Sequence, residues 1–275
     1  MTEHPSPSTQ SPNLLGVDVG FSKTSKTTGL AWRVNGKIDG RRTGSSWEAR
    51  AAALPIGVSF DLAAFDAPLV PAGPDIPRRS CEAVFYRGAF GKRCRPGMSH
   101  FGQGLTLRQA GSIAVQQFHP VVTNHRPPTF AAVAGAAMVE AFPNTFMGVL
   151  LPDAVLAELQ GKRSGKSDRL YEACIAQGAF LRLLGHLDWP ADETIKQLAA
   201  ERDHDIRAAY VCLLTAGLAH AGTATVVGDD VGGWFWLPPL HLWADWAMAA
   251  VSLTIADARK RGFPSVVLKS SKIVI

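Results

Sequence analysis

The stretch Leu14-Leu15-Gly16-Val17-Asp18-Val19-Gly20 decides how this chain folds. Its apolar residues predict a short buried strand over residues 14–19, with Asp18 near the C-terminal end of that strand. A carboxylate in such a run is costly to bury unless a metal ion, a cation or hydrogen-bond donors meet it. Asp18 therefore indicates either a ligand site or a local cap of the turn that follows.

Two further strands follow the first one closely. A polar, basic turn over residues 20–29 leads into a predicted strand at 28–34, and Asn35-Gly36 forms a tight turn into a third strand at 37–43. These three strands predict a meander at the start of the fold. The rest of the chain alternates between strand-like and helix-like patterns, which indicates a mixed α/β sheet.

The later elements are predicted from periodicity and from proline and glycine breaks. Strands are expected at 62–66, within 136–143, in a hairpin over 223–237 and at 264–268. Helices are expected at 47–53, 105–118, 144–150, 152–160, 168–185, 191–200, 206–220 and 241–260, with a short helix among the loops of 69–103.

Composition describes an ordinary globular protein. The chain has 275 residues, of which 47% are hydrophobic and 19% are charged, and its formal net charge is +5, which permits an anionic partner. Residues 1–13 are rich in Pro, Ser and Thr and predict a disordered tail without the features of a signal peptide. With no apolar segment long enough to span a bilayer, we expect a cytoplasmic protein that makes no membrane contact.

Basic residues are densest over residues 69–103, directly after the predicted strand at 62–66. Such a run is often only a solvated surface, but its position favours contact with an anionic substrate. A basic linker over 161–167 contains GKRSGKS, which has three residues between its glycines where a phosphate-binding P-loop has four. The residues predicted to contact phosphates are Arg79, Arg87, Lys92, Arg93 and Lys166.

Four acids follow a common pattern. Asp18, Asp66 and Glu140 each end an apolar strand-like run, and Asp205 lies in the first turn of a helix. If the strands are neighbours, these carboxylates meet at one edge of the sheet, where each raises the pKa of the others. Mg²⁺ or Mn²⁺ would relieve that repulsion, because both ions prefer oxygen ligands. The alternative is that each acid caps an element or forms a local ion pair.

In this order the motifs resemble a family of predicted RNase H-like nucleases of unknown cellular function, which is distantly similar to Holliday-junction resolvases. The matching stretches are Gly16-Val17-Asp18-Val19-Gly20, Phe65-Asp66-Ala67-Pro68-Leu69, Arg79-Ser80-Cys81-Glu82, Glu140-Ala141-Phe142-Pro143, Lys166, and His204-Asp205-x-x-Ala208-Ala209. The resemblance implies an RNase H-like mixed sheet with helices on both faces, in one domain over residues 14–275 with a C-terminal extension from about 222.

The resemblance also implies a site and an activity. Asp18, Asp66 and Asp205 would bind the catalytic metal ions, with Glu140 as a further candidate, and the reaction would be hydrolysis of phosphodiester bonds in nucleic acid. One departure is Ala208, because the family pattern often has a second aspartate there; its absence leaves open a weak or inactive site.

Two other functions remain open from the sequence. An actin-like ATPase or small-molecule kinase also begins with Asp-x-Gly on a first strand, although such folds normally duplicate their domain. A binding module for nucleic acid or protein that has lost the chemistry would account for Ala208. The Trp-rich C-terminal extension predicts either core aromatics or the interface of a homodimer.

Overall fold

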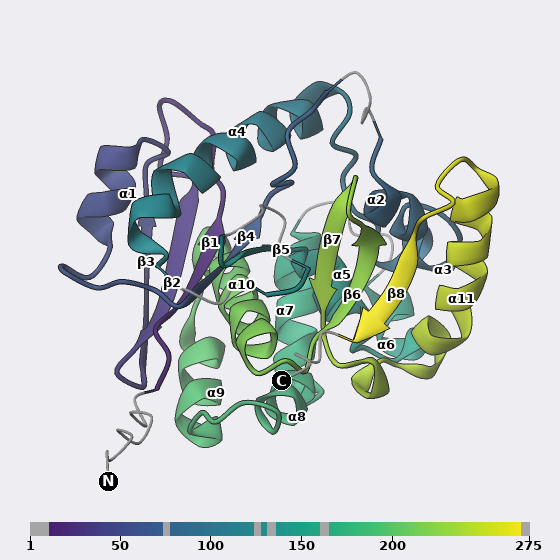
Figure 1. The fold of residues 1–275 in the computed structure, drawn as a ribbon. Helices are drawn as coiled ribbons and strands as arrows, with labels where there is room; N and C mark the ends of the chain where they lie inside the picture. Colours follow the sequence, from purple (N-terminus) through teal and green to yellow (C-terminus); the bar gives the residue numbers. More distant parts are fainter. Residues whose placement is uncertain (1–10, 74–77, 124–127, 131–135, 160–164, 271–275) are drawn as a thin grey trace, which may run out of the picture.

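The computed structural model describes residues 11–73, 78–123, 128–130, 136–159 and 165–270, and the fold is given for these residues. Their strands are β1 Leu14–Asp18, β2 Thr28–Val34, β3 Lys37–Thr43, β4 Leu62–Asp66, β5 Met138–Ala141, β6 Thr225–Asp229, β7 Gly233–Leu237 and β8 Val267–Ser270. All eight belong to one sheet in the order β3-β2-β1-β4-β5-β7-β6-β8 (Figure 1).

The sheet is mixed, as the sequence predicts. β1, β2 and β3 form the antiparallel meander, and β1, β4, β5 and β7 run parallel to one another. β6 runs antiparallel to both β7 and β8. The parallel strands place the C-terminal ends of β1, β4 and β5 at the same edge, which is where the predicted acids lie.

The helices are α1 Trp47–Ala53, α2 Ser80–Phe85, α3 Gly88–Arg93, α4 Gly102–Phe118, α5 Pro143–Val149, α6 Asp153–Glu158, α7 Lys166–Ala176, α8 Ala179–Leu184, α9 Ala191–Ala200, α10 His204–His220 and α11 Asp245–Lys260. The helix predicted at 168–185 divides at Gly178, whose φ of +63° breaks the helical path. The helix predicted from 241 begins at Asp245, because Leu240–Leu242 forms a 3₁₀ turn after two prolines.

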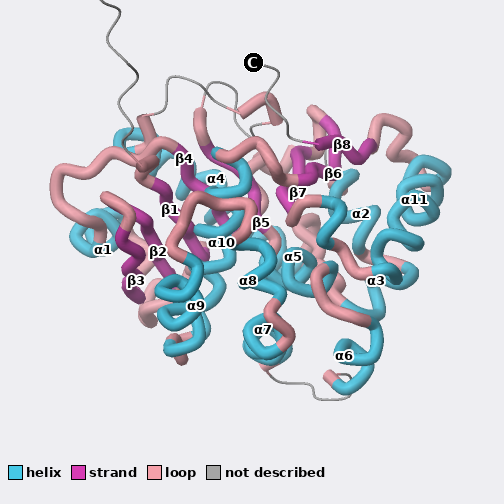
Figure 2. The backbone as a smooth tube through the Cα atoms, turned by 90° about the horizontal axis from the view of Figure 1, so that it is seen from below, coloured by secondary structure: helices cyan, strands magenta, loops and turns pink. Residues whose placement is uncertain are grey.

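Helices cover both faces of the sheet, and the buried residues accordingly form two clusters (Figures 1 and 2). Successive residues of β1 point to opposite faces: Leu14 belongs to the cluster that includes α10, whereas Leu15 and Val17 belong to the cluster that includes Phe118 of α4. Because β1 is buried on both faces, its sequence is a continuous apolar run.

Two glycines allow α10 to lie unusually close to the sheet. A Cβ on Gly16 of β1 would lie 2.2 Å from the carbonyl oxygen of Ala209, and one on Gly29 of β2 would lie 1.9 Å from that of Asp205. Gly29 is the register partner of Asp18. This close approach of the helix to the sheet places the first turn of α10, and with it Asp205, at the end of β1 where Asp18 lies.

The C-terminal extension is part of the same sheet, because β7 pairs with β5 and β6 pairs with β7 and β8. Its tryptophans are core residues: Trp234, Trp236 and Trp243 are buried, and the half-buried Trp246 donates its indole N–H to the carbonyl of Leu151. These side chains are not available for the homodimer interface that was one of the two predictions for this region.

Two predictions concern the outer parts of the chain. Residues 1–10 of the predicted tail lie outside the described residues, and at its end the Asn13 backbone N–H donates to a carboxylate oxygen of Asp61 at 2.8 Å. Within the described residues, no helix combines the length and the apolar character needed to cross a membrane.

Candidate functional site

Asp18 and Asp66 are direct neighbours at the C-terminal edge of the parallel strands. Asp18 ends β1, Asp66 ends β4, and the two residues are partners in the β1–β4 register. Both line a cavity of about 250 Å³, to which Glu140, His204 and Ala208 also contribute. The structure thus brings three of the four predicted acids, Asp18, Asp66 and Glu140, together at the wall of one cavity.

The charges of these two carboxylates are poorly compensated. Burial raises the pKa of Asp18 well above its usual value, and the charges of Asp66 and Asp205 raise it further. Burial, followed by the charge of Glu140, raises the pKa of Asp66 to about 7, and nearby His204 partly opposes this shift. Each carboxylate would therefore gain free energy from a nearby cation.

Asp205 is close enough to influence Asp18, but one oxygen of its own carboxylate is engaged by an arginine. Asp203 caps α10 by accepting hydrogen bonds from the backbone N–H groups of Asp205 and Ile206. Arg42 of β3 forms ion pairs with both acids, at 2.7 Å to Asp205 and 3.3 Å to Asp203. Arg42 engages Oδ2 of Asp205, so the other oxygen, Oδ1, is the one through which Asp205 can serve as a ligand.

Glu140 has a different environment from the one predicted. Both of its carboxylate oxygens accept from the guanidinium of Arg79, at 2.7 Å and 2.5 Å, and one also accepts from the backbone N–H of Leu69 at 3.3 Å. Arg79 further donates to Glu82 and to the carbonyl of Gly232, and its side chain is fully buried. The geometry gives Glu140 a structural ion pair in place of the predicted metal contact.

The same network changes the role of Arg79. Its three guanidinium nitrogens are all engaged by Glu140, Glu82 and Gly232, and none of its side-chain surface is exposed. Four of the five N–H donors of Arg79 are used within the protein and its side chain is fully buried, so the prediction that it contacts the substrate does not fit this arrangement.

The other predicted basic contacts are spread over the surface. Arg87 precedes α3 and lines a second cavity, whereas Lys92 is exposed on α3. Arg93 forms an ion pair with Asp153 at 2.5 Å and lies 4.8 Å from the ring centre of Trp246. Lys166 begins α7, beside Ser167, which lines the cavity that contains Asp18 and Asp66, called the acidic cavity below. Most of the predicted linker before Lys166 lies outside the described residues.

No preformed metal centre is visible. Among the described residues, no three Asp, Glu, His or Cys side chains are placed so that they could hold a metal ion together. The donor set at the cavity nevertheless suits a hard divalent cation, because Asp18 and Asp66 offer adjacent oxygens with raised pKa values and Asp205 interacts with Asp18 electrostatically. Comparison of the chain with protein-family models, curated proteins and solved structures finds no match.

Sequence reasoning missed three residues of this region. Glu82 shares Arg79 with Glu140, His204 lines the cavity with its Nδ1 at 3.2 Å from Asp168, and Arg42 holds Asp205. Glu82 and His204 stand in the stretches that carry the family resemblance, so the sequence held a signal for them. Arg42 lies in an exposed strand with no pattern that distinguishes it from a solvated arginine.

Proposed function

We propose that this protein is a metal-dependent nuclease of RNase H-like fold that hydrolyses phosphodiester bonds of nucleic acid. The observation that supports this function best is the register pairing of Asp18 and Asp66 at the wall of one cavity, with the first turn of α10 packed against the end of β1. The resemblance to RNase H-like enzymes implies such an arrangement. It consists of an acid on the first strand, one on the parallel neighbour of that strand, and one at the start of a helix packed on the first strand.

Asp18 and Asp66 would hold the metal ion, and Asp205 would join them through the oxygen that Arg42 does not engage. Bound there, Mg²⁺ or Mn²⁺ supplies the activation of a water molecule and the stabilisation of the leaving oxygen. The chain's own contribution is to keep the two carboxylates adjacent and uncompensated. His204, at the cavity wall, carries a hydrogen-bonding group that can orient a phosphate or a water there.

A second candidate function is a nucleic-acid-binding module without catalysis. The observation that favours it is the Arg42–Asp205 ion pair at 2.7 Å, together with an alanine at position 208 in the cavity wall. Both features reduce the number of carboxylate oxygens available to a metal ion.

A comparison of cleavage by the wild type and by Asp18→Asn tests the nuclease function. We expect the wild type to cleave nucleic acid in Mn²⁺ or Mg²⁺ and the variant to lose about 100-fold or more of that rate, since a metal ion supplies several kcal/mol to the transition state and each 1.36 kcal/mol is a factor of ten. The measurement is gel-resolved cleavage of labelled single-stranded, duplex and branched DNA, RNA and RNA–DNA hybrid.

Asp39→Asn is the matched control, because Asp39 is exposed on β3 and lines neither cavity. Equal activity of wild type and Asp18→Asn would assign the cleavage to a contaminant. Binding without cleavage by folded wild type, in every metal and on every substrate, would favour the binding module, and ATP turnover without cleavage would favour the ATPase.

A gain-of-ligand variant gives an independent test of the cavity. Ala208→Asp adds a carboxylate to the wall that Asp18 and Asp66 share, and we expect it to tighten Mn²⁺ binding about tenfold, because affinity at such sites follows ligand charge. Isothermal titration with MnCl₂ measures the effect, and Ala208→Asn supplies the same size without the charge. Equal affinities of the two variants would show that the cavity does not hold the ion.

A further inference from the structure

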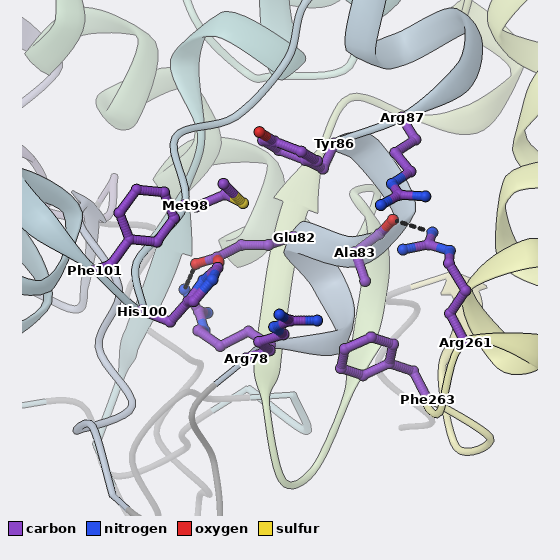
Figure 3. Close-up of a pocket in the computed structure, with 11 residues that line it drawn as sticks. Arg78, Glu82, Ala83, Tyr86, Arg87, Met98, His100, Phe101, Arg261 and Phe263 are labelled. Carbon is purple, nitrogen blue, oxygen red and sulfur yellow. Dashed lines mark hydrogen bonds and ion pairs between the residues drawn. The ribbon is translucent and has the colours of Figure 1, made fainter.

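A second, larger cavity lies beside the acidic one. It measures about 590 Å³ and is built by three segments that are distant in sequence: residues 78–87 around α2, residues 98–101, and residues 261–263 after α11. Figure 3 shows α2 running behind the cavity, with Met98 and Phe101 on one side and Arg261 and Phe263 on the other. Its volume is in the range of pockets that enclose a drug-sized ligand.

The cavity wall offers aromatic surface to a ligand. Tyr86, Phe101 and Phe263 line it together with Met98, and Phe101 keeps 54% of its surface exposed. The rings of Phe101 and His100 form a T-shaped pair at a centroid separation of 4.8 Å, so His100 covers at most one face of the Phe101 ring. A large exposed phenylalanine in the wall of a cavity is a feature of sites that stack on a planar ligand.

The charge of the cavity is positive. Arg78 and Arg87 form no hydrogen bond or ion pair with any described residue, whereas Glu82 is satisfied by Arg79 and by the backbone N–H of Ser99. Arg261 is ion-paired with Asp257 and donates to the carbonyl of Ala83 (Figure 3), so it shapes the wall. Two uncompensated guanidinium groups beside aromatic rings favour an anionic ligand with a planar apolar part.

One hydrogen-bonding group in the wall has no partner. Nδ1 of His100 is buried and makes no hydrogen bond within the described part of the chain. A buried polar atom without a partner costs free energy unless a ligand or water meets it. Because His100 lines the cavity, a base that stacks on Phe101 lies beside a side chain whose Nδ1 lacks a hydrogen bond.

The two cavities share part of their walls, since Arg79, Glu82 and Met98 line both. We propose that the larger cavity binds an unstacked nucleobase of a single-stranded segment, with Arg78 and Arg87 on the flanking phosphates and Phe101 on the base. A strand whose phosphate lies at Asp18 and Asp66 then continues across the shared wall. This inference rests on the proposed action on nucleic acid and selects single-stranded or unpaired substrates, because bases within a duplex are already stacked.

The test measures binding in EDTA, so that cleavage plays no part. Fluorescence anisotropy of the full chain would compare a labelled oligothymidine, a duplex of the same length, and an oligomer of the same length made of abasic sites. Phe101→Ala should weaken oligothymidine binding about tenfold and leave duplex and abasic binding unchanged, because only stacking on a free base is lost. Arg87→Gln should weaken both single strands and reduce the salt dependence by about 0.7.

Leu181→Ala and Arg182→Gln on α8 are the matched controls, since α8 is exposed at these positions and lines neither cavity. Equal effects of Phe101→Ala on single strand and duplex, or no effect, would overturn the inference. An acidic peptide that binds as tightly as oligothymidine and loses affinity equally in Phe101→Ala would also overturn it. If the wild type binds single strands through stacking but cleaves no substrate, this inference stands and the nuclease proposal fails. If the wild type cleaves nucleic acid and Phe101→Ala has no effect on binding, the nuclease proposal stands and this inference fails.

Discussion

Arg79→Met is expected to lower the free energy of unfolding by about 3–5 kcal/mol, because it leaves two buried carboxylates without their cation. Glu140 is 1% exposed and Glu82 is 5% exposed, and both accept from the guanidinium of the fully buried Arg79. The methionine side chain fills a similar volume, so the loss reports the ion pairs and not a cavity. Urea unfolding followed by circular dichroism at pH 7.5 measures it.

Arg93→Met is the matched control for this experiment. Arg93 also forms an ion pair, but with one carboxylate, Asp153, which is more than half exposed, and such pairs contribute about 1 kcal/mol or less. Glu140→Gln combined with Arg79→Met should recover part of the loss, because the unpaired charge at position 140 is gone. Similar losses for Arg79→Met and Arg93→Met would mean that water reaches the Arg79 network.

Asp66→Asn is expected to stabilise the fold above neutral pH by about 2–4 kcal/mol. The pKa of Asp66 is raised from 3.8 to about 7 by burial and by the charge of Glu140. A folded-state pKa above the unfolded one means that the native state binds more protons between these values, so the free energy of unfolding falls as the pH rises from about 4 to 7. One pKa unit corresponds to about 1.36 kcal/mol, which makes about 4 kcal/mol the upper bound.

Thermal or urea unfolding across pH 4–8 measures this effect. The wild type should lose stability as the pH rises through 7, whereas Asp66→Asn should show a smaller loss and should equal the wild type near pH 4. Mn²⁺ at pH 8 should stabilise the wild type and leave Asp66→Asn nearly unchanged, because only the wild type retains the charged ligand. Parallel pH profiles of Asp66→Asn and wild type would contradict the burial of an uncompensated charge, and Asp39→Asn controls for the loss of any carboxylate.

The position of Asp18 and Asp66 in the fold lowers the free energy of unfolding. Two adjacent carboxylates at the end of a buried sheet lower the stability of the protein, and no described residue forms an ion pair with them as Arg79 does with Glu140. Groups with strongly raised pKa values in a cavity are typical of functional sites, although structural networks also produce such shifts. Both cases occur at this edge of the sheet: Asp66 is an uncompensated carboxylate in a cavity, whereas Glu140 belongs to a structural ion-pair network.

Local patterns determined much of the structure. The apolar run at 14–18, the Asn35-Gly36 turn and the alternating runs that follow are properties of a few neighbouring residues, and they placed the strands within about two or three residues. Asp203 as the cap of α10 is a local property in the same sense, because its side chain bonds to N–H groups two and three residues further on. The order of the acids along the chain also led to Asp18 and Asp66.

The tertiary structure alone decided which of those acids keep their charge uncompensated. Arg79 lies 61 residues from Glu140 along the sequence, Arg42 lies far from Asp205, and both pairs form only because the sheet order brings their elements together. The cavity beside them likewise joins three segments that are distant in the sequence, over residues 78–87, 98–101 and 261–263. Residue type and spacing determine which side chains stand at a strand end, whereas pairing depends on distances of a few ångströms between elements, which only the packed fold sets.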